Sequence, residues 1–477
     1  MKIKVSSAVA CSALLTAVTF SLVSPLPAGH AETAPLASRF TMAVFPDTQY
    51  ESAGSFPAGD HFMTKYGSEP YKVQTAWLAK NKKAFGLKFA VHLGDVVDNS
   101  IQEGQWKAAD VAMRTLEQAG IPYSVAPGNH DMGPIPVVGG SANKIAEEAG
   151  YYANDGAQKI HFPREIEVKT NPSLLDGKMP QNYPLFSTWF SVDRARRNPT
   201  FRERFVELNN ESEYHIFTAE GHSFLVLALA YQASDRVLQW AQKVIDQHPN
   251  LPVILTTHEI LKPEGNQVRL TGTYGQHLWD DFIRKNDQIF LTLSGHNAGS
   301  GTIVTRNDKG HAVIHILQDY QEYYDGGNGL LGLLQFDFTH NTIEMLAASP
   351  FVAAKKPSLL TSKDVLYYNN PQDSFVKHLN FAQRFAGFTR FAADPRESND
   401  PDYLGIARES LHRQQPSIKP TVTPFKAEKS AYFEVATYYF PVSIPPVKKQ
   451  QSPTSAFPQQ LWTNEPNSGI TGANSWT

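Results

Sequence analysis

Side chains that can bind metal ions occur in five short motifs spread in order along this 477-residue chain. The motifs are Asp47-Thr48-Gln49, Gly94-Asp95-Val96-Val97-Asp98, Gly128-Asn129-His130-Asp131, Thr257-His258-Glu259 and Gly295-His296-Asn297-Ala298. Hard cations favour carboxylate and amide oxygens, whereas imidazole suits iron, zinc and manganese. Together the five motifs offer all three ligand types, so they indicate a site for two divalent metal ions.

Two metals of this kind are suited to the hydrolysis of phosphoric esters. The anionic oxygens of a phosphoester repel nucleophiles, and two metals about 3.5–4 Å apart neutralise that charge and lower the pKa of a bridging water. An imidazole beside them can protonate the leaving oxygen. Each motif by itself also has an ordinary structural explanation, so the prediction depends on all five converging in space.

Each motif follows the end of a short apolar run that has the pattern of a β-strand. These runs are Phe40–Phe45, Phe89–Leu93, Pro122–Ala126, Pro252–Leu255 and Gln288–Leu293. Helical spacing separates them over Tyr71–Phe85, Gln105–Ala119 and Asp235–Gln247. The alternation predicts an α/β fold from Phe40 to about Pro350, and such folds build their sites where the strands end.

Taken together, the motifs resemble those of the calcineurin-like metallophosphoesterase superfamily, in a secreted branch whose first motif is Asp-x-Gln. The resemblance covers roughly Phe40 to Ser349 and does not reach the C-terminal segment. It implies a four-layer α-β-β-α sandwich, with two central sheets, helices outside and the metals at the sheet edges. A C-terminal extension that is β-rich or irregular would follow this sandwich.

The resemblance also implies which residues bind which metal. Asp95 would bridge the two ions, Asp47 and Gln49 would complete the first site, and the second would take Asn129, His258 and His296. One or two manganese, iron or zinc ions per chain fit this mixture of oxygen and nitrogen ligands.

By the same resemblance, His130 assists the leaving group. Asp98 would orient the His130 ring and stabilise its protonated form, since a carboxylate beside a histidine favours the charged imidazole.

Two positions depart from the family pattern, and both fall in the first metal site. Gln49 stands where a histidine is usual, although its amide oxygen can still bind a hard metal. Ala298 stands where the family has a second histidine, and it cannot bind a metal at all. His311 and His315 follow on the next expected strand. Either is a candidate substitute ligand, and the alternative is an ordinary hydrogen-bonding role for both.

The predicted function is therefore that of a metal-dependent phosphoric ester hydrolase, either a phosphatase or a phosphodiesterase, acting on a small phosphoester. Ala298 supports a first alternative, a catalytically impaired protein that only binds a phosphorylated ligand. A second alternative is a surface or matrix binding protein whose function resides in its aromatic C-terminal segment.

Composition and charge limit the classes of partner. With 43 basic and 46 acidic residues, and no basic run longer than two, the chain has no charge pattern typical of nucleic-acid binding. Cys11 is the only cysteine. It lies in the N-terminal segment, so a chain cleaved after that segment would contain no disulfide.

The ends of the chain differ in composition from the middle. Lys2 and Lys4 precede an apolar run from Val5 to Val23 and a small-residue stretch ending at Ala31. This pattern predicts a signal peptide over residues 1–31, and hence a secreted or periplasmic protein without a transmembrane segment in its mature form. The alternatives are an uncleaved membrane anchor and a lipoprotein acceptor at Cys11.

Three further segments are predicted from composition. Residues 132–210 are expected to form a cap or insertion, and an excursion unrelated to substrate is an equally open interpretation. Residues 351–449 form an aromatic-rich extension, and residues 450–477 are rich in small and polar side chains typical of a flexible tail.

Overall fold

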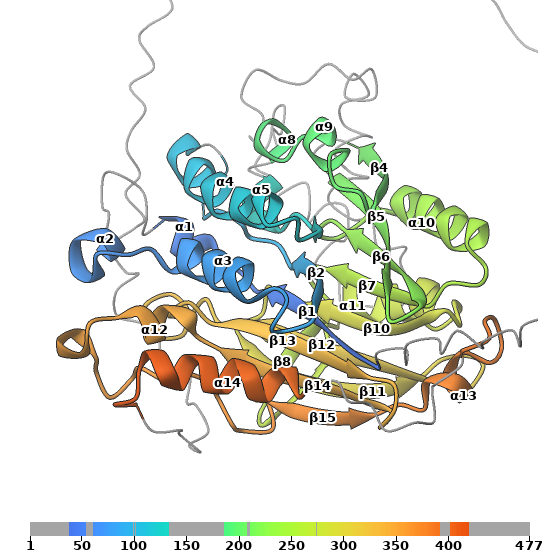
Figure 1. The fold of residues 1–477 in the computed structure, drawn as a ribbon. Helices are drawn as coiled ribbons and strands as arrows, with labels where there is room; N and C mark the ends of the chain where they lie inside the picture. Colours follow the sequence, from blue (N-terminus) through green and yellow to red (C-terminus); the bar gives the residue numbers. More distant parts are fainter. Residues whose placement is uncertain are drawn as a thin grey trace, which may run out of the picture. The chain divides into compact units, whose positions relative to one another are not determined.

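A computed structural model of the chain describes residues 38–53, 61–98, 100, 102–132, 186–207, 210–272, 274–391 and 401–418 (Figure 1). All of them belong to one unit that spans residues 1–430. The predicted signal peptide, the predicted tail and residues 133–185 of the predicted insertion lie outside the described residues.

Two large β-sheets form the centre of the molecule. The first has the strand order β15-β14-β13-β1-β2-β3 and the second the order β11-β12-β10-β7-β6-β5-β4. The strands of the first are β1 (Arg39–Phe45), β2 (Leu87–His92), β3 (Tyr123–Val125), β13 (Leu331–Asp337), β14 (Thr342–Ala348) and β15 (Phe375–His378). Those of the second are β4 (Phe201–Glu207), β5 (Asn210–Ala219), β6 (His222–Leu229), β7 (Val253–Thr257), β10 (Ile289–Ser294), β11 (Gly299–Arg306) and β12 (Ala312–Asp319). A separate hairpin joins β8 (Leu261–Glu264) to β9 (Gln267–Leu270).

Parallel strands lie at one side of the first sheet and form the middle of the second. Strands β1, β2 and β3 pair in parallel, as do β6, β7, β10 and β12. Strands of this kind are normally covered on both faces, which explains their nearly continuous apolar sequences. The carboxyl ends of these parallel strands carry the predicted metal-binding motifs.

The two sheets face each other across a shared apolar core. Phe40 of β1 stacks on Phe336 of β13 with ring centroids 4.6 Å apart, and Phe89 of β2 lies 5.1 Å from Phe217 of β5 in the other sheet. Met42 and Ile254 are also fully buried in this layer. The inner faces of both sheets are therefore packed against each other, as in other sheet-on-sheet cores.

Helices cover the two outer faces and complete four layers (Figure 1). The buried faces of α3 (Pro70–Asn81), α4 (Glu103–Gln118) and α14 (Tyr403–Gln414) share a core with the first sheet. Those of α10 (Asp235–Gln247) and α11 (Tyr274–Leu278) share one with the second. The predicted α-β-β-α sandwich is confirmed.

The helix predictions differ from the structure mainly at the ends. Helix α10 spans the predicted Asp235–Gln247, and the Ser234 hydroxyl accepts a hydrogen bond from the amide of Val237 at its start. Helix α3 ends at Asn81 rather than Phe85, because the chain turns through Gly86 (φ 57°) to begin β2. Gly86 can adopt this positive φ because it has no side chain.

The shorter helices lie in the loops and near the C-terminus. They are α1 (Gln49–Ala53), α2 (His61–Tyr66), α5 (Asn129–Met132), α8 (Phe186–Trp189), α9 (Val192–Ala195), α12 (Pro350–Ala354) and α13 (Phe381–Phe385), with the π-helix η2 (Trp279–Ile283) and the 3-10 helix η3 (Pro357–Leu359). None of the helices in the described part of the chain has the length and apolarity needed to cross a membrane.

Residues beyond 350 contribute to the sandwich itself. Strand β15 pairs with β14, and Leu404, Ala407 and Leu411 of α14 are buried against the helical side of the first sheet. The described parts of the predicted C-terminal extension, residues 351–391 and 401–418, are therefore structural components of these layers.

Candidate metal centre

The predicted ligands are brought together by the ends of parallel strands from both sheets. In the first sheet, Asp47 lies just beyond β1, Asp95 beyond β2, and Asn129 opens α5 after β3. In the second, His258 follows β7 and His296 follows β10.

The residues predicted for the second metal converge closely. Ligand atoms of Asp95, His258 and His296 all lie within 4.8 Å of one another. His258 Nε2 is 3.0 Å from Asn129 Oδ1, 3.3 Å from Asp95 Oδ1 and 3.2 Å from His296 Nδ1. His258 Nδ1 lies 2.9 Å from the Leu93 carbonyl oxygen, which fixes the ring with Nε2 facing the other ligands.

Asp47 and Gln49, predicted for the first metal, are buried beside this group. Asp47 Oδ2 lies 3.9 Å from His258 Nε2, and the His296 amide donates to Asp47 Oδ2 over 3.2 Å. Gln49 is 1% exposed, and no described residue donates a hydrogen bond to its Oε1. A buried amide oxygen without a donor is unfavourable, and a cation would satisfy it.

The electrostatics of the group also fit a bound cation. Burial, followed by the charge of Asp319, raises the pKa of Asp47 well above its usual value. Burial opposes protonation of His258, but Asp95 and Asp47 outweigh it and raise the pKa of His258 to about 10. An imidazole must be neutral to bind a metal, so a divalent ion here would replace this proton and supply the positive charge among the carboxylates.

His130 and Asp98 lie together, in an arrangement slightly different from the predicted one. His130 Nδ1 donates to the backbone carbonyl oxygen of Asp98 over 2.6 Å, while the Asp98 carboxylate is 3.5 Å away. This hydrogen bond leaves His130 Nε2 as the free ring nitrogen, 3.9 Å from Asp95 Oδ2. The His130 side chain is 35% exposed, so a substrate can reach it.

The two histidines considered as substitutes for a ligand at Ala298 have other roles. His315 Nδ1 and Nε2 lie 2.8 Å from the hydroxyls of Thr292 and Thr305, so both ring nitrogens are occupied. His311 Nδ1 lies 2.7 Å from Asp287 Oδ1. Both histidines therefore have the ordinary hydrogen-bonding role that was the alternative to metal binding.

Sequence reasoning assigned no role to two buried carboxylates at the centre. Asp131 accepts hydrogen bonds from the amides of Val97 (3.1 Å) and Gly128 (2.8 Å), which ties the second and third motifs together. Asp319 ends β12 and is fully buried. Burial raises the pKa of each to about 7. The available signal for Asp319 was its position at the end of an apolar strand, which is the signal that located the five motifs.

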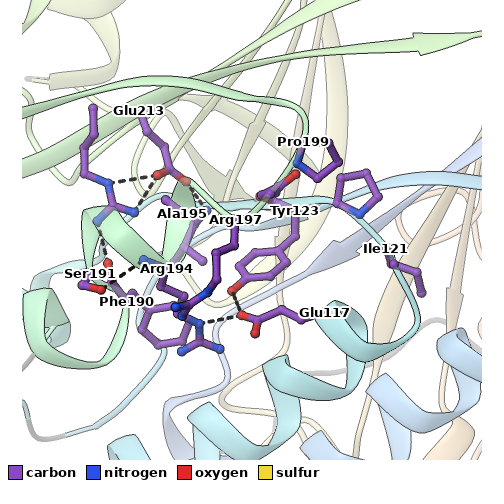
Figure 2. Close-up of a pocket in the computed structure, with 15 residues that line it drawn as sticks. Glu117, Ile121, Tyr123, Phe190, Ser191, Arg194, Ala195, Arg197, Pro199 and Glu213 are labelled. Carbon is purple, nitrogen blue, oxygen red and sulfur yellow. Dashed lines mark hydrogen bonds and ion pairs between the residues drawn. The ribbon is translucent and has the colours of Figure 1, made fainter.

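A cavity of about 310 Å³ lies elsewhere, between α4, β3 and the α9–β4 segment (Figure 2). Arg194 pairs there with Glu117 over 2.6 Å, and Glu117 also accepts a hydrogen bond from the Tyr123 hydroxyl. None of the predicted metal ligands lines this cavity. The metal ligands and the cavity are therefore separate features of the fold.

Comparisons with known sequences find one family and one relative. The sequence model of a family described as calcineurin-like phosphoesterase matches residues 41–300. The uncharacterized protein YvnB of Bacillus subtilis (strain 168) is 28% identical over 330 residues, which are 68% of this chain and 21% of that protein. The chain thus spans about a fifth of the length of that relative.

Two distant matches among solved structures have low TM-scores. GAP50, the anchor in the inner membrane complex of Plasmodium, is 11% identical with a TM-score of 0.35, covering 82% of this chain and 99% of its own. The purple acid phosphatase PPD1 from yellow lupin (Lupinus luteus) seeds is 14% identical with a TM-score of 0.35, covering 75% of this chain and 57% of its own.

Proposed function

Because the chain belongs to the calcineurin-like phosphoesterase family, we propose that it is an exported, metal-dependent hydrolase of small phosphoric esters. The observation that carries the proposal is the convergence of Asp95, Asn129, His258 and His296 around His258 Nε2. These four residues supply the oxygen and nitrogen ligands expected for manganese, iron or zinc.

The roles of the residues follow from their positions. Divalent metals, when bound, neutralise the phosphoryl oxygens and activate a water for attack on phosphorus. Asp47, Gln49 and Asp95 would hold one ion, and Asp95 with Asn129, His258 and His296 would hold the other. A phosphoryl group bound by these ions would lie beside His130, whose Nε2 is 3.9 Å from Asp95 Oδ2.

His130 is the proposed general acid. Its Nδ1–H donates to the Asp98 carbonyl oxygen, so Nε2 faces the leaving-group oxygen and can deliver a proton as the ester bond breaks. The Asp98 carboxylate, 3.5 Å from Nδ1, stabilises the protonated ring before that transfer.

Two parts of the proposal concern segments outside the described residues. We assign residues 1–31 as a cleaved signal peptide, which would place the mature enzyme outside the cytoplasm. We also assign the segment from 132 to 210 as a cap that shapes substrate access. Its described part packs on α4, where the rings of Phe186 and Trp106 are 6.0 Å apart.

The test is hydrolysis of a chromogenic phosphodiester and of the matching monoester by the chain from residue 32 onward, with added manganese. The Asp95→Asn variant should lose at least a thousandfold in rate, or about 4 kcal/mol of transition-state stabilisation, because a neutral amide would replace the carboxylate proposed for both ions. Asp246→Asn, at an exposed position of α10, should hydrolyse at the wild-type rate.

The absence of a ligand side chain at Ala298 supports one competing function. In this alternative the protein binds a phosphorylated ligand without turnover. A folded, manganese-loaded wild-type chain that hydrolyses neither ester would contradict the hydrolase and support this alternative. Turnover that the Asp95→Asn variant lacks would exclude it.

A further inference from the structure

Asp319 lies next to the position where the first metal site lacks its histidine. Strand β12 pairs in parallel with β10, and the last residues paired are Ser294 and Leu317. His296 and Asp319 each follow two residues later, so they occupy equivalent positions on neighbouring strands. Strand β12 also pairs with β11, with Gly299 opposite Asp319. Ala298 is the residue immediately before Gly299, so the end of β12 runs beside the substituted position.

Other contacts place the end of β12 beside Asp47. A Cβ added to Gly295 would overlap Asp47 Oδ1 and would lie 3.6 Å from the Gln318 carbonyl oxygen. The Asp47 carboxylate and the end of strand β12 therefore both lie next to this glycine. Gln321 Nε2 donates to Asp319 Oδ2 (2.9 Å) and to the His296 carbonyl oxygen (3.3 Å), which fixes Asp319 to the fifth motif.

The surroundings of Asp319 favour a cation. Asp319 and Asp47 are 0% and 3% exposed, and across the described ranges no lysine or arginine forms an ion pair with either. Two buried carboxylates in this proximity repel each other, and the orphaned Oε1 of Gln49 adds a third oxygen without a positive partner.

We propose that Asp319 replaces the histidine missing at Ala298, so that the first metal is held by oxygen atoms alone, from Asp47, Gln49, Asp95 and Asp319. The inference deepens the proposed function and rests on its metal centre. Carboxylate and amide oxygens suit manganese and magnesium, whereas the two imidazoles of the second site suit zinc and iron. The chain would therefore hold two different metals, with a hard cation in the first site.

Metal content measures this directly, without any assay of turnover. Metal-free protein is dialysed against manganese, and bound manganese is counted by elemental analysis. Wild type should bind two ions, whereas Asp319→Asn and Asp319→Ala should bind one, with first-site affinity at least a hundredfold weaker. The matched control is Asp373→Asn, which removes a buried carboxylate bonded to Ser300 and Asn370 and should still bind two ions.

Position and selectivity are tested separately. Anomalous scattering from manganese in crystals of the wild-type chain should place one ion within about 2.5 Å of an Asp319 oxygen, a normal distance for such a ligand. When zinc-loaded wild type is dialysed against excess manganese, one zinc ion should exchange well before the other, because a site without imidazole holds zinc less firmly than the site with two histidines. Circular dichroism melting verifies that each variant is folded before its metal is counted.

Three outcomes would overturn the inference: two manganese ions of unchanged affinity in folded Asp319→Asn, no ion within 4 Å of Asp319 in the wild-type crystal, or exchange of both zinc ions at the same rate. The proposed function fails differently, through a wild-type chain that binds no metal or binds it equally well after Asp95→Asn. The two failures are therefore distinguishable.

Discussion

Two of the proposed ligands occupy backbone conformations that residues with side chains rarely adopt. Asp95 has φ 46° and His296 has φ 70°. Such conformations cost about 1–3 kcal/mol each and persist where the surrounding structure enforces them, which is frequently at functional sites. Both residues follow a glycine, and hydrogen bonds from the amides of His130 and His296 fix the carboxylates of Asp95 and Asp47.

Gly128 shows how little space this arrangement leaves. A Cβ on Gly128 would overlap both the carboxylate oxygen and the backbone nitrogen of Asp95, so Gly128→Ala must displace the bridging ligand. We expect manganese affinity to fall at least tenfold, or about 1.4 kcal/mol, measured by isothermal titration calorimetry. Gly272→Ala is the control, because no atom lies within 4 Å of its added Cβ. Equal affinities for the two variants would contradict the expected displacement.

At the scale of elements, local sequence predicted the strands that carry the motifs, since each is a short apolar run that ends at a polar cluster. Helix α10 was predicted to the residue because its apolar spacing and Ser234 cap both mark its bounds.

The proposed role of Asp319 as a ligand was not predicted, because its position beside Asp47 depends on the register of β12 against β10, which no local pattern contains. The burial of α14 against the first sheet likewise depends on contacts with distant residues such as Gln335, whose side chain accepts a hydrogen bond from the Tyr403 amide.

Helix α4 supports the loop that positions the proposed general acid. The Gln105 side-chain oxygen accepts a hydrogen bond from the Asp98 amide over 2.9 Å, and Asp98 in turn accepts from His130. Gln105→Ala should therefore lower kcat about tenfold, or about 1.4 kcal/mol, through misorientation of His130. KM and manganese content should be unchanged, because Gln105 acts on the site through Asp98, which is not a proposed metal ligand.

The matched variant for this prediction is Gln118→Ala, at an exposed position of the same helix, which should keep the wild-type kcat. Steady-state kinetics and elemental analysis of the three proteins provide the comparison. A loss of bound manganese in Gln105→Ala would show that the loop supports the metal centre itself rather than His130.

At the scale of the whole sandwich, a buried ionic network joins the two sheets. Glu213 of β5 accepts a hydrogen bond from the Val125 amide of β3 in the first sheet and pairs with Arg204 of β4 over 2.6 Å. His215 Nε2 lies 3.2 Å from the same carboxylate. Burial opposes the charge on Glu213, but Arg204 and His215 outweigh it and lower its pKa from 4.5 to about 2.

This lowered pKa predicts how the stability of the protein depends on acid. Between pH 4.5 and about 2 the unfolded chain binds a proton at Glu213 that the folded chain does not, so the stabilisation from this carboxylate is complete above pH 4.5 and is lost as the pH falls toward 2. Glu213→Gln removes one of the two carboxylates that pair with Arg204, the other being Glu211, and with it the stabilised charge, and should lower the free energy of unfolding by about 3 kcal/mol at pH 7. Urea unfolding in the presence of a chelator should show this difference shrinking between pH 4.5 and 2.5.

Glu264→Gln, whose exposed ion pair with Arg269 contributes less than about 1 kcal/mol, is the control. If the free energy of unfolding of Glu213→Gln is lower than that of wild type by the same amount at every pH, the variant acts through packing and not through the charge that links the two sheets.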